Sequence, residues 1–298
     1  MKPIELVELI ALAAIWGASF LFMRLGVGEF GPVVLIFLRA GIAAAFLIPI
    51  VLLAKKIQLI KQNSLRLFLV GVIGTALPFS LFSFALLTVS AGYASILNAT
   101  APIFTAVIAW LWVSERLSGI AVTGLIVGFS GVILLVLDDQ SVSTENVFVP
   151  VLACLGATLC YGLGANYTKQ KLAHVHPLAI AGGSQLGATV GLAPFGWWFW
   201  PHTPPGAQAW LAVSLLGIVC TGIAFILYFR LIANVGVIKA MTVTYLIPFF
   251  GVIWGMIFLN ESLTLLMFLG GLLILTGVGL SSGVMQHWKK TKPLVIAP

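Results

Sequence analysis

Apolar residues fill this chain in stretches of about twenty, separated by short segments that contain Gly, Pro or charged residues. A helix rises about 1.5 Å per residue, so such a stretch spans the roughly 30 Å hydrocarbon core of a bilayer. The pattern predicts an all-α, polytopic membrane protein with ten transmembrane helices. We expect these helices at residues 5–25, 32–54, 65–88, 91–113, 118–137, 147–168, 177–200, 207–232, 238–259 and 263–284.

Composition strengthens the membrane interpretation. Apolar residues make up 61% of the chain and charged residues 8%, against about half and a quarter in soluble domains. So few charges cannot cover a surface that faces water, so we expect the lipid bilayer as the main surrounding. The net charge of +7 would otherwise favour a nucleic-acid partner. The basic residues are scattered between apolar stretches, however, which indicates membrane orientation and no nucleic acid.

The positions of Lys and Arg predict the orientation of the chain. With the N-terminus inside, thirteen of the fifteen basic residues fall on the cytoplasmic side. Arg24 falls outside, and Arg39 falls within the second helix. Cytoplasmic segments of membrane proteins are enriched in these residues. We therefore expect a multi-pass protein of the cell (inner) membrane with both termini in the cytoplasm.

An internal repeat divides the chain. A shift of 146 positions aligns matching residues, including Thr75 with Thr221, Phe79 with Phe225, Pro102 with Pro248, Glu115 with Glu261, Gly124 with Gly270 and Gly131 with Gly277. Near the start of each half the shift is 145, which aligns Trp16 with Tyr161, Gly17 with Gly162 and Pro32 with Pro177. The predicted units are 1–140, 147–285 and a short cytoplasmic tail, 286–298. Each repeat holds five helices, so the second enters the membrane from the opposite side. Inverted repeats are typical of secondary transporters, whose halves alternate between inward-open and outward-open cavities.

Several motifs resemble a known family. Trp16-Gly17 lies in the first helix, Arg39 lies in the second, and a P…E-x-L…G pattern occurs twice, beginning at Pro102 and at Pro248. Together these resemble the EamA family of the drug/metabolite transporter superfamily over nearly the whole chain. The resemblance implies ten helices and export of small organic metabolites, often amino acids. It departs from the family pattern at Tyr93, where a cation is expected.

The two repeated prolines predict helix breaks beside a substrate site. Pro102 and Pro248 lie near the middles of the fourth and ninth helices, and proline cannot donate to the carbonyl four residues back. The carbonyls of Asn98 and Thr244 should therefore face protein or a wet cavity, because lipid cannot satisfy them. A kink relieved by neighbouring helices is the alternative.

Polar and aromatic side chains at similar depth complete the candidate substrate site. They are Trp16, Ser19, Phe79, Tyr161, Gln185, Thr242 and Tyr245. Gln185 needs hydrogen-bond partners, so it is either a substrate contact or interhelical glue. Trp16, Phe79 and Tyr161 are either aromatic walls of the cavity or ordinary packing.

Charged residues suggest further roles. A charge at mid-membrane is costly, so Arg39 either binds a substrate carboxylate or has a structural role. Lys239, at the start of the ninth helix, either attracts an anionic group or snorkels to the surface. The carboxylates fall at helix ends or in loops, and Glu8 alone is a candidate for ion coupling. We expect facilitated export, or weak coupling through Glu8.

Other function classes find less support in the sequence. The three cysteines lie in apolar runs without a CxxC motif, and the four histidines lie in loops or at helix ends. We therefore expect no metal and no cofactor. An intramembrane enzyme would need a catalytic constellation at depth, and a non-transporting scaffold is the other alternative. GxxxG spacings at Gly124 and Gly279 favour close packing of the fifth and tenth helices, within a monomer or across a homodimer.

The predicted topology is testable by labelling. Cysteines introduced by Lys56→Cys and Lys171→Cys should both react with an impermeant maleimide added from the cytoplasmic side, because both segments follow an outward-to-inward crossing. A cysteine introduced by His202→Cys should react from the outside and serves as the control. Labelling of positions 56 and 171 from opposite sides would refute the inverted arrangement.

Overall fold

The computed structural model describes residues 2–113, 118–138 and 147–281, and these are folded into helices with no β-strand element among them. The first half contains α1 (Pro3–Leu53), α2 (Ile57–Gln62), α3 (Ser64–Gly71), η1 (Val72–Ala76), α4 (Leu77–Ala85), α5 (Ala91–Asn98), α6 (Ala101–Val113) and α7 (Gly119–Val136). The second contains α8 (Phe148–Lys171), α9 (Pro177–Trp198), α10 (Ala207–Gly217), η3 (Ile218–Ile223), α11 (Ala224–Val235), α12 (Val237–Ala240), α13 (Val243–Leu259) and α14 (Leu265–Ser281). The predicted tail, 286–298, lies outside the described residues.

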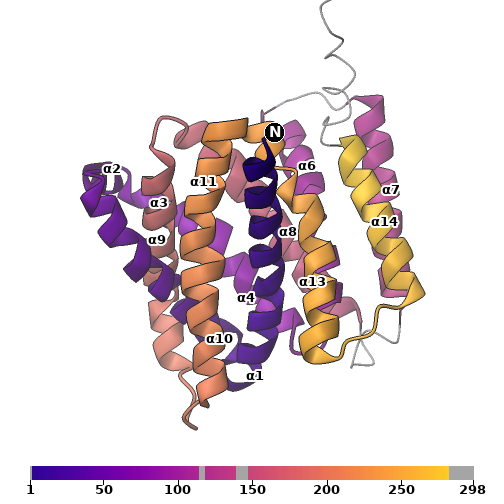
Figure 1. Ribbon diagram of the computed structural model, residues 1–298, viewed down its shortest axis with the longest axis horizontal. Coiled ribbons are helices and arrows are strands. Elements are labelled where there is room, and N and C mark those ends of the chain that lie inside the picture. Colours follow the sequence, from indigo (N-terminus) through magenta and orange to yellow (C-terminus); the bar gives the residue numbers. More distant parts are fainter. Residues whose placement is uncertain (1, 114–117, 139–146, 282–298) are drawn as a thin grey trace, which may run out of the picture.

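The long element α1 consists of two helices that meet at Gly31. Gly31 has φ 72° and ψ 162°, a backbone conformation that glycine adopts without steric cost. Beyond it the chain doubles back. Two contacts show this reversal: Arg39 reaches Met23, and Leu35 packs against Gly26. Figure 1 shows this reversal at the end of α1 opposite the N-terminus. Gly31 therefore separates two apolar helices, 3–30 and 32–53.

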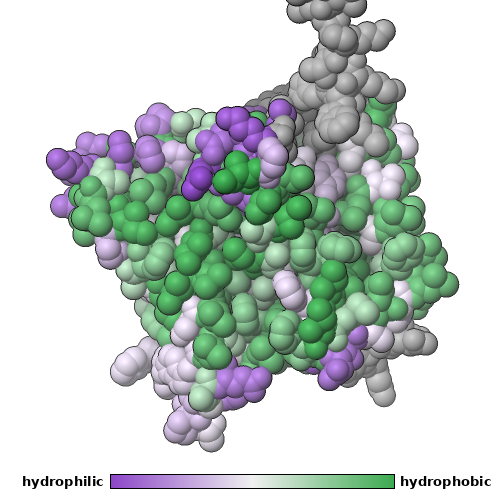
Figure 2. Space-filling view, in the orientation of Figure 1, coloured by the Kyte–Doolittle hydropathy of each residue, from purple (hydrophilic) through white to green (hydrophobic). Residues whose placement is uncertain are grey.

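The exposed surface of the molecule is largely apolar. Seven helical stretches of the described chain are long and apolar enough to cross a membrane: Pro3–Leu53, Ser64–Ala85, Ala91–Trp112, Gly119–Val136, Phe148–Lys171, Pro177–Trp198 and Ala207–Val235. Two shorter apolar helices are Val243–Leu259 and Leu265–Ser281. Figure 2 shows a wide hydrophobic band between hydrophilic residues at the upper and lower edges of the view. Since a soluble protein does not expose such a band, the chain is a multi-pass membrane protein.

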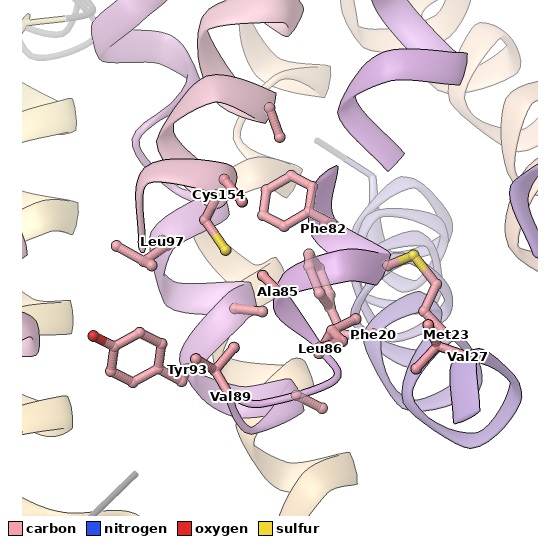
Figure 3. Close-up of a cluster of buried hydrophobic side chains, with 14 of the residues drawn as sticks. Phe20, Met23, Val27, Phe82, Ala85, Leu86, Val89, Tyr93, Leu97 and Cys154 are labelled. Atoms are coloured by element: carbon pink, nitrogen blue, oxygen red, sulfur yellow. The ribbon is translucent and has the colours of Figure 1, made fainter. Parts of the chain in front are cut away.

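Side chains from several helices form the main core. Phe20 and Met23 of α1, Phe82 of α4 and Cys154 of α8 are all buried there, and Figure 3 shows them converging. The rings of Phe20 and Phe82 meet edge to face, with centroids 5.6 Å apart, a favourable geometry for aromatic pairs. The core therefore joins helices from both halves of the sequence.

Glu261 closes the start of α5. Its carboxylate accepts hydrogen bonds from the backbone N–H groups of Ala91 at 2.7 Å and Gly92 at 3.0 Å. The first N–H groups of a helix have no partner within the helix, and the helix dipole favours an anion there. Glu261, which the sequence places at a helix end, thus caps a helix that lies 170 residues away along the chain. Its repeat equivalent, Glu115, lies outside the described residues.

Glycines bring α7 and α14 into close contact. A Cβ atom added to Gly124 would lie 2.6 Å from the carbonyl oxygen of Gly277, and one added to Gly131 would lie 2.6 Å from that of Gly270. Figure 1 shows the two helices side by side. Gly124 and Gly131 are the repeat equivalents of Gly270 and Gly277, so the two contacts are reciprocal. The glycines pack these helices within one chain.

Gly277→Ala should destabilise the protein, whereas Gly279→Ala should not. The added methyl group at Gly277 would overlap the backbone of α7, and no atom lies within 4 Å of a Cβ placed at Gly279. We expect a loss of about 1–3 kcal/mol for Gly277→Ala, the usual cost of overpacking. Thermal unfolding of the two purified variants in detergent measures the difference. Equal unfolding midpoints would contradict this packing.

Candidate functional site

Arg39 lies at the centre of a buried polar cluster. Its side chain is 2% exposed. Its Nε donates to Thr221 Oγ1 of η3 at 3.0 Å, and its Nη1 donates to Met23 Sδ at 3.7 Å. The guanidinium carbon lies 3.4 Å from the ring centroid of Phe79, a cation–π contact. The charge is therefore held by three neutral groups from three parts of the fold.

The described carboxylates are all engaged elsewhere. Glu5 accepts from the Lys2 backbone, Glu8 pairs with Arg230, Glu29 accepts from Gly206 N, Asp138 accepts from Thr264 and Glu261 caps α5. Within residues 2–113, 118–138 and 147–281, Arg39 thus has no anionic partner. An unneutralised charge at membrane depth costs about 2.5–3.5 kcal/mol on insertion scales. Because of this cost, Arg39 is the residue of the site whose burial most needs an explanation.

A second hydrogen bond mirrors that of Arg39. Gln185 of α9 is buried, and its Nε2 lies 3.4 Å from Thr75 Oγ1 of η1. Thr75 is the equivalent of Thr221 at the 146-residue shift, and Gln185 lies next to Ser184, the equivalent of Arg39 at the 145-residue shift of the early helices. Each half therefore contributes one donor and one threonine acceptor, and each bond joins a donor from one half to a threonine from the other.

Both threonines lie in π-helical turns. The segments Val72–Ala76 and Ile218–Ile223 interrupt otherwise α-helical spans at equivalent places in the two halves. Thr221 Oγ1 also donates to the carbonyl of Leu216, five residues back, at 2.8 Å. Single π turns inside α-helices occur frequently at functional sites. The two turns position the hydroxyl groups that receive Arg39 and Gln185.

Aromatic pairs flank this cluster. The rings of Phe79 and Tyr161 lie 5.6 Å apart, and those of Phe82 and Tyr161 lie 6.1 Å apart. Trp16 instead packs on Tyr228, at 5.1 Å, so the three predicted wall residues do not form a single stack. Trp16 and Tyr228 are the repeat equivalents of Tyr161 and Phe82. The aromatic contacts are thus reciprocal, like the hydrogen bonds.

Several buried polar atoms have no hydrogen-bond partner among the described residues. They include Ser19 Oγ, Ser80 Oγ, Ser83 Oγ and Gln185 Oε1. Leaving such an atom unsatisfied costs about 1–3 kcal/mol, so a native structure that keeps several of them needs a reason. A polar ligand or water within reach of these groups would remove the cost.

The helix breaks differ between the repeats. α5 ends at Asn98 and α6 begins at Ala101, with Pro102 in its first turn, so the predicted break lies there and Asn98 is half-buried beside it. The second repeat requires a correction. Pro248 lies inside α13, and the break occurs earlier, between Ala240 and Val243.

The other residues predicted near Pro248 are less central than expected. The hydroxyl groups of Thr242 and Thr244 donate to the backbone carbonyls of Lys239 and Met241, three residues back, at 2.7 and 2.8 Å. Tyr245 packs against the main core. Lys239 is exposed at the surface, as a snorkelling side chain would be. Of the two cations considered for the site, Lys239 and Arg39, only Arg39 is buried.

Glu8 has a partner that the sequence did not indicate. Its Oε1 lies 3.0 Å from Arg230 Nη2 of α11; the Glu8 side chain is 11% exposed and that of Arg230 is 62% exposed. Glu8 Oε2 is buried and has no hydrogen-bond partner among the described residues. The ion pair joins α1 to α11 near the N-terminal end of α1.

A cavity of about 650 Å³ lies away from this cluster. Phe37, Ala193, Trp197 and Trp200 line it, and none of these was predicted as a substrate contact. The two tryptophans are exposed, and tryptophan is enriched where membrane proteins meet the membrane–water interface. The cavity is therefore an apolar surface feature and not the polar site.

Comparison with known families decides the class of protein. The model of the EamA-like transporter family matches residues 4–137 and again residues 149–283. The chain belongs to the EamA-like transporter family. It is therefore a membrane transporter of small molecules and not an enzyme.

Named relatives of this EamA-like transporter cover nearly its whole length. It is 24% identical to YoaV of Bacillus subtilis, an uncharacterised transporter, over 94% of this chain and 97% of that protein. It is 23% identical to a probable amino-acid metabolite efflux pump of Escherichia coli, over 94% of each. It is 25% identical to a probable terminal-alkyne amino-acid exporter of Streptantibioticus cattleyicolor, over 91% of this chain and 90% of that one.

A solved structure has the same fold. The crystal structure of another protein superposes with a TM-score of 0.67 at 19% identity, over 97% of this transporter and 100% of that chain. At this identity the likeness shows the fold alone.

The sequence-based site omitted several residues that the structure brings to the cluster. They are Met23, Thr75 and Thr221; Tyr228, which packs on Trp16, was not predicted either. A signal for two of them was present, because Thr75 and Thr221 align in the repeat. No comparable sequence signal marks Met23.

Thr221→Val should destabilise this transporter more than Thr75→Val. The first substitution removes the acceptor of a buried charged donor, which is worth about 1.5–3 kcal/mol, and the second removes a long neutral hydrogen bond worth about 1 kcal/mol or less. The two threonines are repeat equivalents in similar π turns, so each variant is the control for the other. Thermal unfolding in detergent measures both. A larger loss for Thr75→Val would contradict the importance of the Arg39 contact.

Proposed function

We propose that this protein exports small organic metabolites, with amino acids as the favoured class, by alternating access. In this proposal ten helices cross the inner membrane as two inverted five-helix repeats, 1–140 and 147–285, with both termini in the cytoplasm. The substrate site lies between the repeats, around Arg39 and Gln185. The reciprocal hydrogen bonds of these two residues are the observation that carries the proposal.

Reciprocal contacts recur at several levels of the molecule and support the inverted arrangement. Gly17 of α1 lies close to the backbone of Gly251 in α13. Its repeat equivalent, Gly162, lies close to the backbone of Thr105, and Thr105 is the repeat equivalent of Gly251. The same exchange relates the glycine contacts of α7 with α14 and the aromatic contacts of Trp16 and Tyr161. Such exchange is expected when two similar units pack around a pseudo-two-fold axis.

Two aromatic contacts support alternating access. Trp16 with Tyr228 and Phe82 with Tyr161 occupy equivalent positions in the two repeats. In an inverted arrangement one pair lies toward each side of the membrane from the central polar cluster. Separating one pair while the other stays packed would open the cluster to one side at a time, and exchanging the two arrangements would carry a solute across.

The character of the site supports a small amphipathic solute. Arg39, Gln185 and Ser19 offer polar groups, while Phe79, Tyr161 and Trp16 offer apolar surface. Two of the named relatives are described as handling amino acids or their metabolites, and both are described as moving them outward. An amino acid has a charged end and a side chain that match these two kinds of surface.

Glu8 is the candidate for coupling to an ion. Its ion pair with Arg230 joins α1 to α11, two helices that belong to different repeats. A solute-driven separation of these helices would break the pair and leave the carboxylate free to take up a proton. Facilitated export without coupling is the alternative, and a proton gradient imposed on proteoliposomes distinguishes the two.

Transport by purified protein in proteoliposomes tests the proposed function. A panel of radiolabelled amino acids should include at least one solute with saturable, protein-dependent flux. Trp16→Ala and Asn98→Ala should lower that flux by about tenfold, the effect of losing one good contact to the solute. Trp198→Ala is the control, because Trp198 is 82% exposed and is not among the residues of the proposed site.

Two outcomes would overturn these assignments. Absence of saturable flux across the panel would favour a non-transporting scaffold. Normal flux in both Trp16→Ala and Asn98→Ala would show that the substrate site lies elsewhere.

A further inference from the structure

We infer that Arg39 binds the carboxylate of the transported solute, so that the protein selects small organic acids, including amino acids, against equally shaped neutral or cationic compounds. This inference rests on the proposed function and names the chemical group that the site recognises.

The hydrogen-bonding capacity of Arg39 is only partly used. A guanidinium has five N–H donors and no acceptor. One is used by Thr221 and one by the weak thioether acceptor of Met23. Both hydrogens of Nη2 and one of Nη1 therefore have no described partner. These are enough for the two parallel bonds of an arginine–carboxylate contact.

The protein supplies no anion for this charge in the described part of the chain. Each described Asp or Glu is engaged by another group, and the nearest neighbours of the guanidinium are a hydroxyl, a thioether and an aromatic ring. Buried charges in membrane proteins are normally paired. An anionic solute would form an ion pair with Arg39. When the solute leaves, Arg39 is again surrounded only by neutral groups and can bind the next solute.

The magnitude of the charge favours a carboxylate over a phosphate ester. A phosphate monoester carries about −1.5 to −2 charges at neutral pH and would require a second cation nearby. Every other described Lys and Arg is at least partly exposed. Arg24 is half-buried, and its guanidinium already donates to the carbonyl of Leu86. One buried arginine neutralises one carboxylate.

The surroundings of Arg39 fit the remainder of such a solute. Phe79 lies under the guanidinium and packs on Tyr161, which offers aromatic surface to an apolar side chain. Thr75, one turn before Phe79, contacts Gln185, whose Oε1 is a buried acceptor without a described partner. An ammonium or hydroxyl group of the solute would satisfy that oxygen.

Matched compounds test this inference. Purified protein in detergent is titrated with L-leucine and L-phenylalanine, with L-leucinamide and L-phenylalaninamide, and with inorganic phosphate, and thermal stabilisation is measured. The same compounds then compete with flux of radiolabelled amino acids in proteoliposomes. We expect at least one acid to bind about ten- to a hundredfold more tightly than its amide, the range for a hydrogen-bonded charge.

Variants separate recognition from folding. Arg39→Gln should reduce binding of the acid to the level of its amide while leaving the affinity for the amide unchanged. Arg66→Gln is the matched control: it makes the same chemical change at an exposed arginine that contacts the backbone of Lys171, and it should keep the preference for the acid. If Arg39→Gln does not fold, the comparison of acid and amide on the unaltered protein decides the question.

The outcomes distinguish the inference from the proposed function. Saturable flux with equal competition by acids and amides, or stronger binding of phosphate, overturns the carboxylate assignment and leaves transport intact. A preference for acids that persists in folded Arg39→Gln also overturns it. Absence of flux and of stabilisation across the whole panel overturns the proposed function, and this inference with it.

Discussion

The absence of water from the hydrocarbon core governs this structure. Each backbone N–H and C=O group at that depth must find a partner within the protein, and helices satisfy this need along most of the chain. The departures from regular helix have compensating contacts or occur at turns. Gly31 reverses the chain at one end of α1, and the π turn at Thr221 gains a side-chain bond to the carbonyl of Leu216. Glu261 satisfies the exposed N–H groups at the start of α5.

The same constraint gives Arg39 its importance. In water a guanidinium is solvated at no cost, whereas in this site it depends on a threonine, a methionine and a phenylalanine ring. These contacts hold the side chain in place without neutralising it. A site of this kind responds strongly to an anion, because low polarity around the charge strengthens any ionic contact. If Arg39 binds the solute as proposed, stability and recognition both depend on this one residue.

The packing contacts of the two halves are nearly symmetric, but the polar residues at equivalent positions differ. Glycine and aromatic contacts recur with the halves exchanged, but Arg39 stands where the other half has Ser184, next to Gln185, and Ser19 stands where it has Gly164. In the proposed alternating-access mechanism, two identical inverted halves would make the inward-open and outward-open states equal in energy. A charge on one side of the axis would remove that equality and give the proposed solute a defined orientation.

The apolar stretches along the sequence predicted the membrane class and a reversal near residue 31. The matching residues of the internal repeat predicted two related halves, and the family model matches the chain twice. These features depend on local hydropathy and on residues such as Gly and Pro, which act on the backbone conformation at their own positions. The sequence placed Glu261 at a helix end, but the helix that it caps, α5, lies 170 residues away along the chain and only the tertiary structure identified it. The partners of Arg39, Trp16 and Glu8 did not follow, because Thr221, Tyr228 and Arg230 are distant in sequence and reach them only through the rotation of each helix about its axis. Packing of small residues such as Gly17 and Gly217 against neighbouring helices sets that rotation. For the same reason a proline at 248 did not decide where its helix breaks: the tertiary structure keeps α13 intact through Pro248 and breaks the chain before Val243.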